Sequence, residues 1–151
     1  MKTKKNFTSE FFNKTFEFTN IEVDGNYLTN RGKSSVVRQF SKQLIPNFKL
    51  NFRVRSNGVS ALDIYMNHDF DAERDLQNIF DVFQAGDFNG MTDTYEFDST
   101  NRFVLVGENG ENIDVSFMYV FVHDRPMYGT KEYREWELSI HGDPVYRRQF
   151  A

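Results

Sequence analysis

The 151-residue chain contains no cysteine and no long hydrophobic run. The first absence excludes disulfides, thiolate chemistry and any zinc or iron–sulfur site with cysteine ligands. The second excludes a membrane-spanning helix, which needs about 20 consecutive apolar residues. The basic N-terminus MKTKKNFTSEFF also lacks the apolar segment of a secretion signal. We therefore expect a cytoplasmic protein, or a virion protein if a phage or mobile element encodes it, as the Asn- and Phe-rich composition suggests.

The motifs of several ligand-binding and enzyme classes are missing as well. Gly32-Lys33-Ser34 is not a phosphate-binding P-loop, because no glycine stands five residues before Gly32. The acidic cluster from Asp69 to Asp75 is not a calcium loop, because its sixth residue is not glycine and its twelfth is not glutamate. No Gly-x-Ser-x-Gly nucleophile turn occurs. We interpret Gly32-Lys33-Ser34 and the acidic cluster from Asp69 to Asp75 as helix starts. We expect no cofactor and no metal site.

Aromatic residues, by contrast, make up 17% of the chain, with 17 Phe against one Trp. Such a composition predicts a packed globular core and argues against disorder. The length favours one domain. We expect residues 1–14 to form a basic N-terminal arm or a short helix, and residues 15–151 to form a single domain.

The strongest local pattern lies in residues 48–66. Apolar and polar side chains alternate over residues 48–55 and again over residues 61–66, which is typical of half-buried strands. Asn57-Gly58 between them favours a two-residue type I′ turn. The segment is therefore predicted to be a β-hairpin.

A helix is predicted directly after this hairpin. Its apolar residues recur at spacings of three and four, its cap is Asp69 or Asp71, and Gly86 ends it. An earlier helix is predicted from Ser34 or Ser35 to Leu44, before Pro46. The apolar residues of the later helix are Leu76, Ile79, Phe80 and Phe83.

The other segments show strand patterns. Strands are expected at residues 15–23, 27–28, 95–97, 102–106, 113–122 and 133–140. The first contains a bulge or a bend between Phe18 and Ile21, and strand 113–122 is apolar on both faces, which predicts a central position. The predicted fold is an α+β domain: a mostly antiparallel sheet of about seven or eight strands, in the order ββαββα and then ββββ, with two packed helices.

Charge is distributed unevenly along the chain. Residues 1–55 carry a net charge of +7, residues 56–130 carry −11 and residues 131–151 are neutral. Such asymmetry marks either a polyanion-binding face or two halves that attract each other within one fold. Lys49, Arg53 and Arg55 share one strand face and are the candidate nucleic-acid contacts. Because Phe48 and Phe52 have the opposite parity, we favour a solvated outer face for these cations.

Each of the three histidines, at positions 68, 123 and 141, has an acidic residue close by. The catalytic candidates are His123 with Asp124 and His141 with Asp143, which lie near predicted strand ends. No pair of histidines has metal-ligand spacing.

We expect a small non-catalytic protein that binds another protein, for example a virion accessory protein, an inhibitor or an immunity protein. The first alternative is a single-stranded nucleic-acid-binding protein that uses the basic N-terminal third. The second is a small enzyme with a His/Asp pocket. The oligomeric state is left open.

Overall fold

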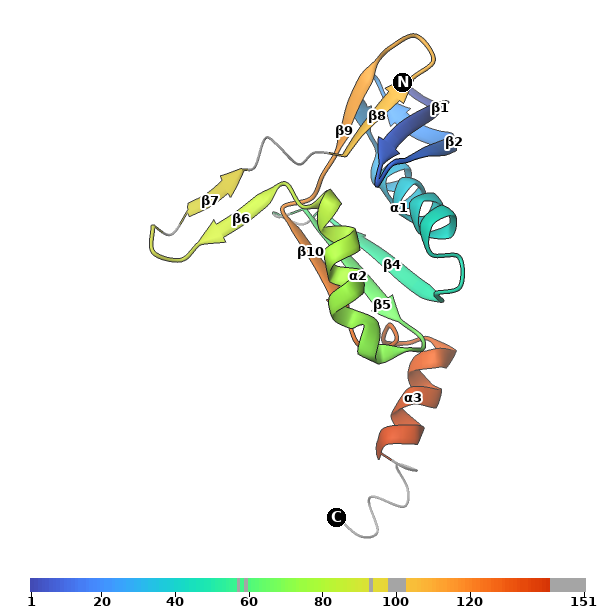
Figure 1. Ribbon diagram of the computed structural model, residues 1–151, viewed down its shortest axis with the longest axis vertical. Coiled ribbons are helices and arrows are strands. Elements are labelled where there is room, and N and C mark those ends of the chain that lie inside the picture. The colour runs from blue at the N-terminus through green and yellow to red at the C-terminus, as the bar shows by residue number, and fades with distance from the viewer. Residues whose placement is uncertain (57, 59, 93, 98–102, 142–151) are drawn as a thin grey trace.

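The computed structural model describes residues 1–56, 58, 60–92, 94–97 and 103–141, without the side chains of Phe88, Asn89, Phe97 and His141. The α+β class is confirmed, although the described residues form ten strands and three α-helices, more than predicted. Figure 1 shows α1 beside the larger sheet, α2 over the smaller one, and both the β6–β7 hairpin and α3 projecting from the body. The elements are β1 (Lys2–Phe11), β2 (Lys14–Asp24), β3 (Tyr27–Leu28), α1 (Asn30–Leu44), β4 (Leu50–Arg55), β5 (Ala61–Met66), η1 (Phe70–Ala72), α2 (Glu73–Phe80), η2 (Asp81–Phe83), β6 (Gly86–Asn89), β7 (Thr94–Phe97), β8 (Phe103–Gly107), β9 (Asn112–Val115), β10 (Tyr119–His123) and α3 (Lys131–His141), where η marks a 3-10 helix.

The N-terminal segment is a strand, and not the predicted arm or short helix. β1 pairs with β2 in a hairpin whose two turn residues, Phe12 and Asn13, have φ of 52° and 55°. Positive φ is uncommon for Phe, so the sequence lacks the usual glycine signal of such a turn. The irregularity predicted between Phe18 and Ile21, a bulge or a bend, is a bulge, because the pairing register shifts there and Asn20 has φ of 55°.

The larger sheet has the strand order β3-β2-β1-β8-β9, with antiparallel neighbours. Its two edge strands, β3 and β9, approach each other, so the sheet is strongly curved. The predicted turn at Asp24-Gly25 and the short return strand are both present, and Gly25 has φ of 62°. This sheet supplies one wall of the core.

The first helix ends at Leu44 as predicted but begins earlier than predicted. Neither Ser34 nor Ser35 is the N-cap; the side chain of Thr29 accepts a hydrogen bond from the Gly32 N–H at 3.1 Å. A serine in the first turns of a helix cannot be distinguished by sequence from a serine at the N-cap. The sequence pattern therefore did not determine at which residue α1 begins.

α1 packs on β2, and two of its glutamines bond to the strand backbone. The Gln39 amide bonds to the N–H and C=O of Thr19, and Gln43 bonds to those of Glu17, at 2.7–3.0 Å. Because β3 pairs only with the end of β2, these amides satisfy backbone groups that β3 leaves open.

The smaller sheet has the strand order β10-β5-β4. The predicted hairpin is confirmed, since β4 and β5 pair antiparallel from Leu50 and Met66 to Arg55 and Ala61. The predicted two-residue turn is wrong: residues 56–60 connect the strands, and Asn57 lies outside the described residues. At the end of this connection, the Ser60 carbonyl accepts a hydrogen bond from the N–H of Met118, ahead of β10.

α2 covers the apolar face of this sheet, as predicted, with Leu76 and Phe80 buried. Asp69 occupies the N-cap position of η1, with φ of 50°, but no side-chain capping bond forms there or at the start of α2, whose N-cap residue is Ala72. The predicted C-terminal cap at Gly86 is wrong. Gly86 begins β6, because the chain after η2 turns extended.

The long central strand predicted at residues 113–122 is two strands in different sheets. β9 ends at Val115 at the edge of the larger sheet, and β10 is an edge strand of the smaller one. Between them, the Phe117 N–H donates to the Phe83 carbonyl and its own carbonyl accepts from Ala85. These bonds to Phe83 and Ala85 take the backbone groups that a continuous strand would use.

The predicted last strand, residues 133–140, belongs to helix α3. Thr130 caps it, accepting from the Tyr133 N–H at 3.1 Å. Tyr133 and Trp136 are half-buried at helical spacing, whereas Leu138 and Ile140, which share the predicted strand face, are exposed. None of the described helices has the length and apolarity needed to cross a membrane.

Phenylalanine rings from both sheets and from the helices meet in one buried core. Phe40 of α1 lies at its centre, with edge-to-face contacts to rings of β8, α2 and η2. The fully buried rings are Phe16, Phe18, Phe40, Phe80, Phe83, Phe103 and Phe117. The aromatic content therefore serves the core, as the composition predicts.

Candidate functional site

Two hollows adjoin at β4 and share Phe52 and Met127, and together they form what we call the basic groove. The narrow end, about 360 Å³, lies between α1 and the start of β4, and the wide end, about 640 Å³, lies beside the segment that follows β10. Besides the two shared residues, the narrow end is lined by Arg38, Ser41, Lys42, Pro46, Phe48, Lys49, Leu50 and Asn51, and the wide end by Arg53, Tyr65, Arg125, Pro126, Tyr128 and Tyr133.

The groove gathers positive charge from three separate parts of the chain. Arg38 and Lys42 lie one turn apart on α1, Lys49 and Arg53 come from the start and middle of the β4 segment, and Arg125 follows β10. All five are exposed. No aspartate or glutamate is among the described residues that line the groove. A strongly positive surface therefore exists on a chain whose net charge is −4.

Aromatic rings line the groove together with these cations. Phe48 and Phe52 are half-buried beside Lys49 and the β4 edge, and three tyrosines line the wide end. Tyr128 is 83% exposed. Flat rings beside cations suit ligands that combine negative charge with planar groups.

The three cations predicted on one strand face do not have the same environment. Lys49 and Arg53 line the groove, whereas Arg55 pairs with Asp63, at 2.5 Å from Nε to Oδ2. The Asp63 side chain is only 5% exposed and also bonds to His123 Nε2 at 3.0 Å. Arg55 therefore compensates a buried carboxylate.

This buried carboxylate connects to the groove through an aromatic stack. The His123 ring lies 4.6 Å from the Tyr65 ring with an interplanar angle of 11°. Parallel pairing of β10 with β5 places these two residues side by side. Asp63 and His123 thus fix the position of Tyr65, which lines the wide end of the groove.

Of the two predicted catalytic pairs, His123 does not bond to Asp124, and the side chains of His141 and Asp143 are outside the described part of the structure. His123 bonds to Asp63 and not to its neighbour Asp124, which is exposed. His141 is the last residue of α3 and its side chain is not described, and Asp143 lies outside the described residues. No group of three or more metal-ligating side chains occurs in the described part of the chain. The His123 imidazole, bonded to the Asp63 carboxylate, is therefore the candidate for proton transfer on this face of the sheet.

We predict that Arg55→Ala lowers the free energy of unfolding by about 2 kcal/mol, because it removes one of two partners of a buried carboxylate. Arg53→Ala is the matched control: it is a neighbour on the same strand face, it is exposed and no described carboxylate pairs with it. Its expected cost is within about 0.5 kcal/mol. Urea denaturation of both variants measures the difference, and equal stability would contradict the role of Arg55.

Two ionisable groups outside the groove have shifted pKa values, and in both cases burial is the main cause. Burial lowers the pKa of Lys33, whose ammonium lies 5.2 Å from the centre of the Phe117 ring. Burial also raises the pKa of Tyr95, whose hydroxyl donates a hydrogen bond to the Met118 carbonyl. Both side chains therefore belong to the packing between elements.

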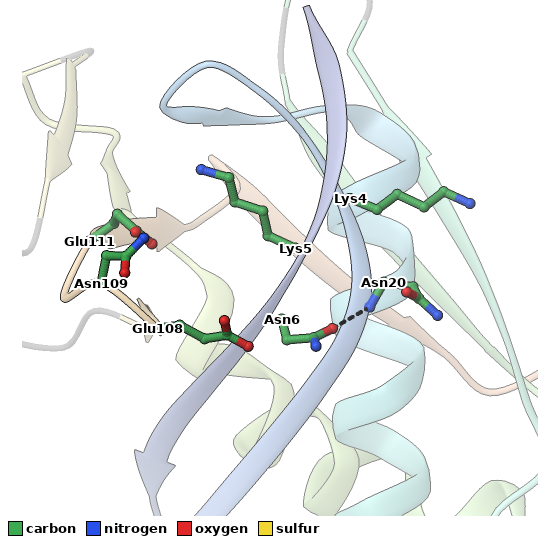
Figure 2. A pocket seen from close by; sticks show the side chains of 7 residues that line it. All are labelled: Lys4, Lys5, Asn6, Asn20, Glu108, Asn109 and Glu111. Atoms are coloured by element: carbon green, nitrogen blue, oxygen red, sulfur yellow. Dashed lines mark hydrogen bonds between the residues drawn. The ribbon is translucent and has the colours of Figure 1, made fainter.

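A third hollow, of about 300 Å³, lies on the larger sheet beside the β8–β9 turn (Figure 2). The Asn6 side chain accepts a hydrogen bond from the Asn20 N–H at 3.0 Å, which holds the bulge of β2. Figure 2 shows Lys4 pointing away from the two glutamates. The charges of the two lysines and two glutamates that line this third hollow cancel, and its described lining has no aromatic ring. The third hollow is therefore a weaker candidate than the groove. Its lining is Lys4, Lys5, Asn6, Asn20, Glu108, Asn109 and Glu111.

Part of the groove was accessible to sequence reasoning and was missed. The hairpin pattern already assigns Tyr65 to the same outward face as Arg53, so an aromatic residue beside the cations could have been inferred. Arg125 and Tyr128 carried no such signal. They reach the groove because the Arg125 carbonyl accepts from the Met66 N–H, which ties the segment after β10 to the end of β5.

No protein-family model matches this sequence, and neither a curated protein nor a solved structure is significantly similar to it. The geometry of the groove is therefore the basis for a functional conclusion.

Proposed function

We propose that this protein binds nucleic acid in the basic groove. The observation that carries the proposal is the set of five exposed cations in a groove whose described lining has no carboxylate. Each nucleotide brings one negative phosphate, and pairing phosphates with Lys or Arg releases condensed counterions. Because residues 56–130 carry a net charge of −11, this local concentration of positive charge directs a polyanion to one place.

Aromatic residues favour nucleic acid over a purely acidic ligand. Tyr65, Tyr128 and Tyr133 line the same hollow as Arg53 and Arg125. Bases stack on such rings without regard to sequence, whereas the Asp and Glu side chains of an acidic peptide have no aromatic face. The protein-binding role expected from the sequence stays a prediction without a defined surface. The small-enzyme alternative is supported less, because His123 is bonded to the buried Asp63 and not to its predicted partner Asp124.

The test is a binding titration of the full chain with a fluorescein-labelled 20-nucleotide strand, followed by fluorescence anisotropy at 50 to 200 mM salt. If the five cations each neutralise one phosphate, the logarithm of the association constant falls against the logarithm of salt with a slope of about −3.5. The labelled strand should bind at micromolar protein or below at the lowest salt.

Two outcomes would reject the proposal. One is no binding at 100 μM protein and 50 mM salt. The other is binding whose affinity does not change with salt, because five phosphate contacts require that dependence.

A further inference from the structure

The wide end of the groove points to the form of nucleic acid that it takes. We propose that unpaired bases stack on Tyr128 and Tyr133 while Arg53 and Arg125 hold the adjacent phosphates, so that the ligand is single-stranded. This inference depends on the proposed function and adds to it the class of strand. The four side chains line one hollow of about 640 Å³.

Tyr128, Tyr133 and Trp136 form an aromatic cluster whose rings are inclined to one another, by 68° between Tyr128 and Tyr133. The ring centroids of Tyr128 and Tyr133 are 5.1 Å apart, and those of Tyr133 and Trp136 are 5.4 Å apart. Tyr133 and Trp136 are half-buried, so they support the surface from α3, while Tyr128 is 83% exposed. A large apolar ring that is ordered against its neighbours yet open to solvent is available to a planar ligand.

A third aromatic residue of the same hollow, Tyr65, is held rigidly. Tyr65 stacks on His123, which is bonded to the buried Asp63. Its position is thus set before a ligand arrives, which reduces the entropy lost on binding. The hollow is within the 300–1,000 Å³ range of ligand pockets, which leaves room for a nucleobase between its walls.

A double helix cannot use these rings. Its bases are stacked and paired inside, and it presents mainly phosphates to a concave protein surface. Only a strand with free base faces gains both the phosphate contacts of Arg53 and Arg125 and the stacking contacts of the tyrosines. The same cations should therefore hold duplex more weakly than single strand at equal salt.

The experiment compares Tyr128→Ala, Tyr128→Phe and wild type with a labelled 20-nucleotide strand and with its duplex, at one salt concentration. We expect wild type to bind the single strand at least tenfold more tightly than the duplex. Tyr128→Ala should weaken single-strand binding about tenfold and leave duplex binding unchanged, while Tyr128→Phe, which keeps the ring, should bind like wild type. Because Tyr128 is exposed, its loss should not affect folding, which circular dichroism checks.

Tyr27→Ala is the matched control, since Tyr27 is 78% exposed on β3 and lies outside the groove lining. Equal affinity for both strand forms, or single-strand binding unaffected by Tyr128→Ala, overturns this inference and leaves the proposed function standing. Binding of neither form overturns both.

Discussion

Reversing the charge of Arg53 and Arg125 together is expected to weaken nucleic-acid binding at least 100-fold at 100 mM salt. Both side chains are exposed in the wide end of the groove, and no described carboxylate is among its lining. Arg53→Glu with Arg125→Glu removes two phosphate contacts and adds two repulsive charges close to the strand. The salt slope should fall in magnitude from about 3.5 to about 2. Anisotropy titrations at several salt concentrations measure both quantities.

The matched control changes the net charge by the same amount at another place. Lys2→Glu with Lys4→Glu also makes the chain four charges more negative, and both lysines are exposed on β1. If affinity depends on the groove, this control should lose no more than about threefold, which reflects the long-range field alone. A control variant that binds as weakly as the groove variant would mean that net charge, and not the groove, governs binding.

The largest effect on stability is expected for Phe40→Ala, at about 3–5 kcal/mol. Phe40 has no exposed surface and connects the two sheets through α1. Removing its ring leaves a cavity and also eliminates several edge-to-face contacts. Each such contact stabilises the fold beyond the free energy gained by burying the ring. Its ring neighbours, at centroid distances of 5.0–6.4 Å, are Phe12, Phe16, Phe80, Phe83 and Phe103.

Thermal and urea denaturation measure this loss, which corresponds to a decrease in Tm of about 10 °C or more for a chain of this size. Domains have about 5–15 kcal/mol of stability in total, so the variant should be close to its folding limit. Phe40→Leu, which keeps most of the volume, should cost much less. Tyr27→Ala, an exposed aromatic, should cost within about 0.5 kcal/mol, and a Phe40→Ala variant as stable as that control would contradict the central position of this ring.

Local patterns were reliable where neighbouring residues in the chain also pack together. The β4–β5 hairpin, the amphipathic α2 and the bulge in β2 all follow from periodicity over a few residues. The same pattern predicted the outward direction of Arg53, because the side-chain period of a strand is two. The abundance of Phe and the absence of Cys likewise indicated a core that needs no covalent support.

Patterns failed where a long-range partner determines the backbone conformation. Residues 113–122 alternate like one strand, yet bonds from Phe117 to Phe83 and Ala85 divide them between two sheets. Alternating side chains at residues 133–140 fit a strand as well as a helix face, and the Thr130 cap and the packing of Tyr133 select the helix. Phe12 adopts a positive φ because the β1–β2 pairing compensates for that local cost.

The groove belongs to this second kind of feature. The amino-acid sequence determined that the first third is basic and that Lys49 and Arg53 share one side of a strand. Folding decided that Arg38 and Lys42 reach them from α1, and that Arg125 and Tyr128 reach them from the segment after β10. It also decided that Arg55 pairs with Asp63. The physical reason lies in the core. Arg125 is far in the chain from the other four cations of the groove, and these like charges share a surface only because the apolar faces of their elements are buried together.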